Sequence, residues 1–236
     1  MLRRLSFVTV MVLAALVGLL KMEVWADVVV NEVMSNTGND TELIELYNTI
    51  GSGNINVDNL TFKDGGGYSD TIVAWSTQNP TVGIPGCDTT TTVIGADSYA
   101  VILDPDYAGG HYNFPVGTII LTIQTTSALG NGLGNSESIT LFDNTGNTVS
   151  SYGGWIGASA DVSVERIDPD WLDVACNWAE NTTSDSTPGA VNSVDTSFAG
   201  SDPTAKFTPD TTTINECSSV TFTNTSDSDG CQAITG

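Results

Sequence analysis

The segment TELIELYN, residues 41–48, does most to define the fold of this chain. It is rich in Ile, Leu and Tyr. The polar turn cluster SNTGND (residues 35–40) precedes it, and GSGN (residues 51–54) follows it. Short apolar runs between Gly, Asn and Asp clusters are typical of β-strands. We therefore predict a strand here, and a second one just before it in DVVVNEVM (residues 27–34).

The same pattern continues along the chain. The loop Asn144-Thr145-Gly146 predicts a hairpin, because glycine readily adopts the positive φ that such a turn needs. No stretch after residue 26 keeps a 3.6-residue period long enough for a helix. Strands without intervening helices indicate an antiparallel β-sandwich or barrel. The further strands are predicted at residues 59–62, 70–75, 98–104, 117–123, 137–143, 147–153 and 161–167.

Residues 1–26 are predicted to be a signal peptide. Arg3 and Arg4 precede an apolar run at residues 5–20, and Val24 and Ala26 fit the cleft of a signal peptidase. The alternative is an uncleaved membrane anchor, but the run is shorter than the roughly 20 residues that span a bilayer. Cleavage after Ala26 would leave a secreted or cell-surface protein without a transmembrane segment.

The charge of the chain limits its function. The 236 residues include 28 Asp and Glu but only 6 Lys and Arg, with a formal net charge of −22, and His111 is the single histidine. Nucleic-acid binding by this portion is excluded, because such proteins need Lys and Arg to displace counterions. We interpret the acidity as the solvated exterior of a secreted domain that attracts cations such as Ca²⁺.

The four cysteines permit three disulfide pairings. They are Cys87, Cys176, Cys217 and Cys231, an even number that suits an oxidising compartment. We prefer Cys217–Cys231 together with Cys87–Cys176, because each bridge then stays inside one predicted domain. A zinc site is disfavoured, since there is no C-x-x-C motif and His111 has no ligand partner at zinc-site spacing.

The predicted domains follow from changes in composition. Residues 27–193 form the first domain, residues 194–202 a linker, and residues 203–236 a second β-rich unit with strands in AKF and SSVTFTN. That unit is shorter than the roughly 40 residues that most domains need to fold without extra cross-links. We therefore expect it to be an incomplete domain of a longer protein.

Segments of the first domain such as TELIELYN (41–48), SYAVILDPD (98–106) and SVERIDP (163–169) occur in the order found in a known family. On these segments, the first domain resembles the lamin tail domain in its bacterial, secreted form. The resemblance implies an all-β, immunoglobulin-like antiparallel β-sandwich that acts as an accessory module beside hydrolases or on surface proteins. A Cys-containing insertion at residues 76–97 departs from the family pattern. The matching segments, in order, are VVVNEVMSN (28–36), TELIELYN (41–48), NVDNLTFKDGG (56–66), SYAVILDPD (98–106), ESITLFDNTGNTVSSYGGW (137–155), SVERIDP (163–169) and STPGAVN (186–192).

The second unit resembles the first strands of a PKD domain, another extracellular immunoglobulin-like module. Within it, Asp227 and Asp229 precede Gly230 in the turn DSDG and are weak candidate ligands for Ca²⁺. The alternative is a solvated turn that binds no metal. No other cofactor is expected.

Few other residues suggest chemistry. Arg166, the only arginine left after cleavage, is predicted to be a structural ion-pair partner of Glu45 or Glu165. His111 is expected in a surface loop. ALGNGLGNSES (residues 128–138) lacks the lysine of a phosphate-binding loop and is predicted to connect two strands. Nothing marks a catalytic pair of carboxylates.

Two functions remain open. The first is a non-catalytic extracellular binding, adhesion or targeting module of a larger secreted or cell-surface protein, with an unidentified extracellular ligand. The alternative is the N-terminal accessory region of a secreted hydrolase of the nuclease or phosphatase type, whose catalytic domain lies beyond residue 236. Neither hypothesis makes this portion an enzyme.

Overall fold

The computed structural model describes residues 28–38, 40–49, 51–125, 128–183 and 186–194, and the backbone of residues 207–209 and 222–224. The predicted signal peptide and the predicted linker apart from Val194 lie outside these ranges, as do Cys217, Cys231, Asp227 and Asp229. Within the described ranges, no helix has the length and apolar character needed to cross a membrane.

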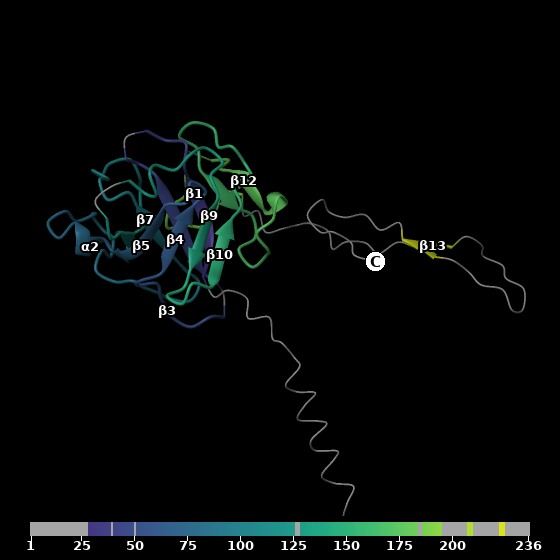
Figure 1. Ribbon diagram of the computed structural model, residues 1–236, viewed down its shortest axis with the longest axis horizontal. Helices are drawn as coiled ribbons and strands as arrows, with labels where there is room; N and C mark the ends of the chain where they lie inside the picture. Colours follow the sequence, from purple (N-terminus) through teal and green to yellow (C-terminus); the bar gives the residue numbers. More distant parts are fainter. Residues whose placement is uncertain are drawn as a thin grey trace, which may run out of the picture.

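The described part of the chain is built from β-strands, which confirms the predicted all-β class (Figure 1). All nine predicted strands of the first domain are present within a few residues of their expected bounds. The described residues include two short helical turns, α2 (Trp75–Gln78) and the 3₁₀ turn η1 (Ala175–Asn177). The strands are β1 (Val28–Met34), β2 (Leu43–Asn48), β3 (Ile55–Asn56), β4 (Thr61–Asp64), β5 (Ser69–Ala74), β6 (Val93–Ile94), β7 (Ser98–Leu103), β8 (Ile119–Ile123), β9 (Ile139–Phe142), β10 (Thr148–Tyr152), β11 (Val164–Arg166) and β12 (Trp178–Glu180).

Ten of these strands form one sheet that curls into a sandwich. Their order is β10-β9-β4-β5-β8-β7-β2-β1-β11-β12. The edge strand β10 packs back against β1, where the backbone N–H of Val30 donates to Ser150 Oγ over 3.0 Å. One half of the sheet therefore covers the other.

The pairing of β7 with β8 is parallel, whereas the other pairs of this sheet are antiparallel. Parallel neighbours need a longer connection than a hairpin supplies, and residues 104–118 provide it. A separate antiparallel pair, β13 (Phe207–Pro209) with β14 (Phe222–Asn224), overlaps the two strands predicted in the second unit.

Both faces of the β1-β2-β7-β8 layer are buried. Along β7, Ala100 and Ile102 belong to the inner core between the two layers. Val101 and Leu103 point the other way and join an outer cluster with Met34, Leu43, Trp75, Tyr107 and Ile120. Ile84 and Cys87 pack against that cluster, so part of the 76–97 insertion covers the outer face.

A β-bulge in β1 separates apolar from acidic positions. The register between β1 and β2 shifts between Val30 and Glu32. The extra residue, Asn31, lets Val30 and Val33 both enter the inner core and leaves Glu32 on the outer face.

Glu32 is the centre of a row of three buried glutamates. It lies opposite Glu165 of β11 on one side and Glu45 of β2 on the other. The exposed fraction of each side chain is 0%. Carboxylates at such depth need hydrogen-bond donors, because burial removes their water.

The donors come mainly from residues 186–194, which we call the closing segment. The N–H of Thr187 donates to Glu32 Oε1 (2.9 Å), and the N–H of Gly189 donates to Glu45 Oε2 (2.5 Å). The closing segment forms no strand, so the carboxylates replace the carbonyl acceptors of a β-ladder.

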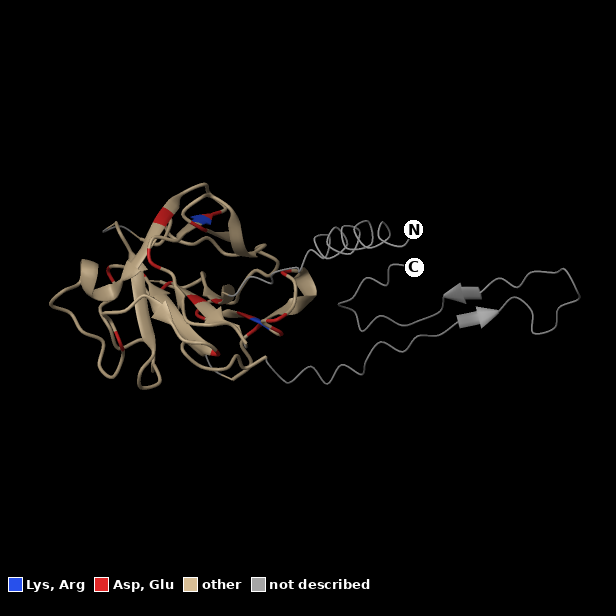
Figure 2. Cartoon of the chain, turned by 90° about the horizontal axis from the view of Figure 1, so that it is seen from below, with Lys and Arg blue, Asp and Glu red and all other residues tan. Residues whose placement is uncertain are grey.

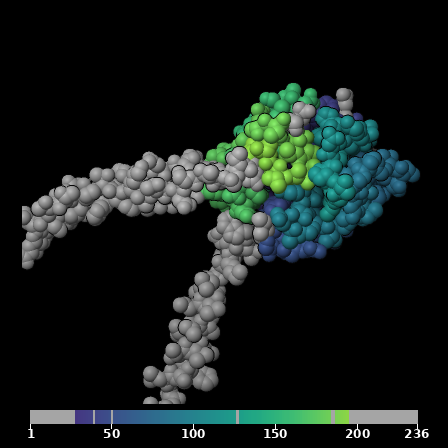
Figure 3. Space-filling view, turned by 180° about the vertical axis from the view of Figure 1, so that it is seen from behind, coloured from purple at the N-terminus to yellow at the C-terminus, as the bar shows by residue number. Residues whose placement is uncertain are grey.

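Glu165 completes this contact. It accepts hydrogen bonds from Thr187 Oγ1 (2.5 Å), Ser193 Oγ (2.7 Å) and the N–H of Val194 (3.2 Å). In Figure 3, the light-green surface of the last described residues lies beside the teal surface of the β7–β8 connection. The closing segment therefore covers the outer face next to that connection.

The interpretation of the acidity as a solvated exterior is wrong for six acidic residues, whose side chains are buried. Acidic positions occur within the sheet as well as in the loops (Figure 2). Sequence alone did not show this, because a second layer of loops covers the outer face. The buried acidic residues are Glu32, Glu45, Asp64, Asp70, Asp104 and Glu165.

The predicted ion pair of Arg166 with Glu45 or Glu165 is also wrong. Neighbouring residues of a strand point to opposite faces, so Arg166 faces inward whereas Glu165 faces the closing segment. Glu45 shares that outer face. Within the described chain, Glu45 and Glu165 take their hydrogen bonds from other donors.

Backbone carbonyl oxygens accept the hydrogen bonds of Arg166 instead. Its guanidinium donates to the carbonyl oxygens of Val30 (2.9 Å), Trp171 (2.8 Å) and Ser151 (3.1 Å), and lies 4.9 Å from the centre of the Trp178 ring. Burial lowers the pKa of Arg166 to about 10. Arg166 thus joins β11 to both β1 and β10.

The predicted Cys87–Cys176 bridge is absent. Cys87 is a free thiol that packs against the outer cluster, and burial raises its pKa. Cys176 is disulfide-bonded. Its partner is not Cys87, which is the other cysteine within the described ranges.

Because the three glutamates are buried, we predict that the free energy of unfolding falls as pH rises. Burial raises the pKa of Glu32 from 4.5 to about 7 and that of Glu45 well above its ordinary value, and repulsion within the row adds to both effects. Between pH 4.5 and 7 the folded state therefore holds more protons than the unfolded state. A carboxyl pKa that is one unit higher in the folded state adds about 1.4 kcal/mol to the stability at low pH. We expect a higher Tm by calorimetry at pH 5 than at pH 8.

The variant Glu32→Gln is the control for this prediction, because Gln keeps the acceptor for Thr187 N–H but does not titrate. We expect a smaller difference in Tm between the two pH values. A Tm at pH 8 that equals or exceeds the value at pH 5 contradicts the account, as does an unchanged difference in Glu32→Gln.

Candidate functional site

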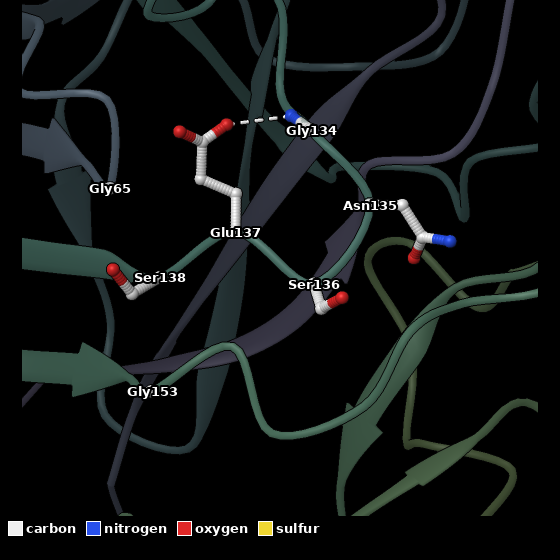
Figure 4. Close-up of a pocket in the computed structure, with 7 residues that line it drawn as sticks. All are labelled: Gly65, Gly134, Asn135, Ser136, Glu137, Ser138 and Gly153. Atoms are coloured by element: carbon white, nitrogen blue, oxygen red, sulfur yellow. Dashed lines mark hydrogen bonds between the residues drawn. The ribbon is translucent and has the colours of Figure 1, made fainter.

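A polar hollow of about 410 Å³ lies where three connections meet (Figure 4). One is the β4–β5 turn, another is the loop between β8 and β9, and the third is the segment that follows β10. The lining residues are Gly65, Gly134, Asn135, Ser136, Glu137, Ser138 and Gly153.

The β8–β9 loop is held by carboxylates that bind its backbone N–H groups. The N–H of Leu129 donates to Asp104 Oδ2 (3.2 Å), and the N–H of Gly130 donates to Asp70 Oδ2 (2.8 Å). Burial raises the pKa of both aspartates. These bonds fix the loop without regular secondary structure.

Glu42 plays the same part further along the loop. Its Oε1 accepts from the N–H of Leu133 over 2.8 Å. Burial raises the pKa of Glu42 to about 7, and repulsion from Asp104 and Glu137 adds to this. Glu42 precedes β2, so the loop is tied to the centre of the sheet.

Glu137 joins two walls of the hollow. Its Oε1 accepts from the N–H of Gly66 in the β4–β5 turn (2.7 Å), and its Oε2 accepts from the N–H of Gly134 (2.6 Å, dashed in Figure 4). Both oxygens are engaged with backbone. Glu137 therefore organises the hollow and is not placed as a free acid or base.

The third wall approaches the loop at a glycine. Gly154 has φ +69°, and a Cβ there would stand 2.3 Å from the carbonyl oxygen of Ser136. Only glycine allows the segment after β10 to lie this close to the loop.

Uncharged polar groups remain available at the surface. Asn135 and Ser136 are exposed and Ser138 is half-buried. In the described part of the chain, none of these three side chains hydrogen-bonds to protein. Asn135 and Ser136 point away from Ser138 (Figure 4): a Cβ on Gly157 would lie 3.3 Å from Asn135 Oδ1 and 3.4 Å from Ser136 Oγ, whereas a Cβ on Gly65 would lie 3.0 Å from Ser138 Oγ. The three side chains therefore offer hydroxyl and amide groups to a ligand on two sides of the loop.

Two exposed aromatic rings stand at the rim. Trp155 is 47% exposed and lies across Gly153, where a Cβ would be 2.4 Å from its ring. Tyr68 is 52% exposed, and its Cδ2 would lie 3.5 Å from a Cβ on Gly66. Both rings therefore border residues that form the hollow or its turn.

The indole of Trp155 is held in place. Its Nε1 donates to Asp173 Oδ1 (3.0 Å), which also accepts from Trp178 Nε1 (2.9 Å). Asp173 Oδ2 accepts from Ser151 Oγ (2.7 Å). This side chain is a pre-positioned contact surface rather than a mobile one.

A second hollow of about 310 Å³ lies between residues 111–115 and the closing segment. His111 is exposed there, as predicted, and its ring meets the edge of Tyr112 at 4.6 Å between centroids. The Tyr112 hydroxyl donates to the carbonyl of Thr41. Thr187, which binds Glu32, also lines this hollow.

None of the sequence-predicted site residues lines the polar hollow. Arg166 and Glu45 lie in strands on opposite faces, and the calcium candidates Asp227 and Asp229 lie outside the described residues, so calcium stays a prediction. Among the residues that the structure describes, no group of three or more His, Cys, Asp or Glu side chains is placed to hold a metal ion.

Residues 128–138 do connect two strands, as predicted, but their role in a site was missed. The signal was available: Gly, Asn and Ser repeat there, and a glycine pair precedes Trp155 in the next connection. Gly, Asn, Ser and Trp are common in binding loops, because small polar groups adapt and aromatic rings give large contact areas.

Gly154→Ala tests the close packing of the hollow. The alanine would combine an unfavourable positive φ with a clash against the Ser136 carbonyl. Gly146→Ala is the matched control, because Gly146 has φ +86° and open space around its Cβ. We expect Gly146→Ala to cost about 1 kcal/mol of unfolding free energy in urea titrations, and Gly154→Ala clearly more. Equal costs would contradict the packing described.

Comparison with known proteins gives a family without an assigned role. No curated protein matches the chain. Residues 26–184 match a family described as a domain of unknown function (DUF8705). The match includes strands β1 to β12 and all three connections that form the polar hollow, and it ends before the closing segment. Because it spans well over half of the 236 residues, the chain belongs to this family.

Proposed function

We propose that this chain is a non-catalytic binding module of a larger secreted or cell-surface protein, and that it holds an extracellular ligand in the polar hollow. The observation that carries this proposal is the hollow itself. Its lining includes polar side chains that have no protein partner, and beside it, at Gly153, lies the ring of Trp155, which a hydrogen bond holds in place.

The chemistry of the lining favours binding over catalysis. Among the lining residues Glu137 is the ionisable one, and backbone N–H groups occupy both of its oxygens. A general acid or base must be free to reach the proton that it transfers. The hollow instead offers hydrogen-bond donors and acceptors, with the ring of Trp155 beside it.

The position of the hollow also suits a binding module. Loops that connect the strands of a β-sandwich can vary while the scaffold remains rigid, and immunoglobulin-like domains bind through them. The resemblance to lamin tail domains, the predicted signal peptide and the resemblance of the second unit to a PKD domain support an extracellular setting. An accessory role beside a secreted hydrolase would use the same surface.

Asn135→Arg tests this function. The purified chain, mixed with insoluble cellulose, chitin, peptidoglycan and collagen, is expected to bind at least one of them saturably in a pull-down isotherm. A long side chain at position 135 would occupy the hollow and weaken that binding about tenfold or more.

The matched control is Asn131→Arg, which makes the same exchange at an exposed position of the same loop outside the hollow. It is expected to bind as wild type. The proposal fails if no material binds saturably, or if the two variants lose binding equally at unchanged Tm.

A further inference from the structure

We propose that the ligand of the polar hollow is a neutral oligosaccharide, with one sugar ring stacked on Trp155 and the hydroxyl groups of the oligosaccharide as a whole bonded to Asn135, Ser136 and Ser138. This inference rests on the proposed binding function and adds the chemical class of the ligand.

The charge of the lining excludes an anionic ligand. Phosphate, sulfate and carboxylate groups are bound by Arg, Lys or several converging backbone N–H groups. The lining residues include no basic side chain, and the N–H groups of Gly66 and Gly134 already donate to Glu137. An anion would also face the carboxylate of Glu137.

The lining does not suit a purely apolar ligand either. Such ligands bind in enclosed clefts lined by large apolar side chains. Here the lining consists of glycine, serine, asparagine and glutamate. Burying an apolar group against them would take hydroxyl and amide groups out of water without a replacement partner.

A neutral sugar satisfies both kinds of group. Its ring has an apolar C–H face that contacts an aromatic ring, because C–H groups are drawn to the negative face of the π-system. Its hydroxyls both donate and accept, which matches the serine hydroxyls and the asparagine amide. The hollow of about 410 Å³ lies at the lower end of the usual ligand-site range of about 300–1,000 Å³.

The two aromatic rings lie beside different parts of the hollow. Trp155 borders the hollow at Gly153, and Tyr68 borders it through the turn that Glu137 binds. Because Asp173 holds the indole of Trp155, little side-chain entropy is lost when a sugar stacks on it. Successive sugar units can therefore contact Trp155 and Tyr68 in turn.

Titration calorimetry with defined oligosaccharides tests the inference. The probes are cellohexaose, xylohexaose, mannohexaose, laminarihexaose and hexa-N-acetylchitohexaose, with hexagalacturonate as the charged comparison. At least one neutral probe is expected to bind and to change the intrinsic tryptophan fluorescence, and hexagalacturonate is expected to bind more weakly than that probe.

Trp155→Ala is expected to weaken binding about tenfold or more, equivalent to about 1.4 kcal/mol. Trp155→Phe retains an aromatic face and should recover part of the affinity. Tyr68→Ala should weaken binding to a lesser degree. Val116→Ala, at a side chain 92% exposed outside the hollow, is the control that should leave binding unchanged. Each variant is compared at unchanged Tm.

Two results overturn the inference: no neutral probe binds, or affinity is unchanged in both Trp155→Ala and Tyr68→Ala. The proposed function is judged separately. If all sugars fail but binding to collagen remains sensitive to Asn135→Arg, the ligand class is wrong and the binding function stands. If no material binds either, both proposals fall.

Discussion

The buried row of Glu32, Glu45 and Glu165 is the constraint on which the outer face of this domain depends. Three carboxylates on neighbouring strands repel one another and lose their water, so they need hydrogen-bond donors beyond Asn31 of β1, which donates to Glu45 Oε1. The closing segment supplies them through Thr187 and Gly189 among others. The row and the segment are therefore mutually dependent, and residues more than 140 positions apart in sequence are held together.

The same chemistry shapes the loops around the polar hollow. Asp104, Asp70, Glu42 and Glu137 each accept a hydrogen bond from a backbone N–H of the β8–β9 loop. Acidic side chains thus replace the carbonyl groups that regular secondary structure would provide. Part of the large excess of acidic residues has this structural role, and its result is a rigid, glycine-rich surface with exposed hydroxyl, amide and aromatic groups.

Sequence patterns were sufficient for nine of the strands β1 to β12 and insufficient for what covers them. The alternation in TELIELYN shows which residues share a face, but not that the face with Glu45 is covered by residues from the other end of the domain. The burial of Glu32, the carbonyl partners of Arg166 and the free thiol of Cys87 all depend on such distant contacts. The strands β3, β6 and β12 were too short to give a pattern. One local signal was overlooked: each of the three glutamates stands between apolar residues or beside one, in NEV, IEL and VER.

Amide hydrogen exchange of Gly189 measures the central contact most directly. Gly189 lies outside any strand, so its N–H is protected from exchange by the carboxylate of Glu45 and not by a β-ladder. We expect exchange about as slow as that of the strand amides in β2, because release of Gly189 from Glu45 would require opening of the buried row. Exchange as fast as that of the exposed loop residue Gly109 would show that the closing segment does not depend on the glutamates, and would contradict the account.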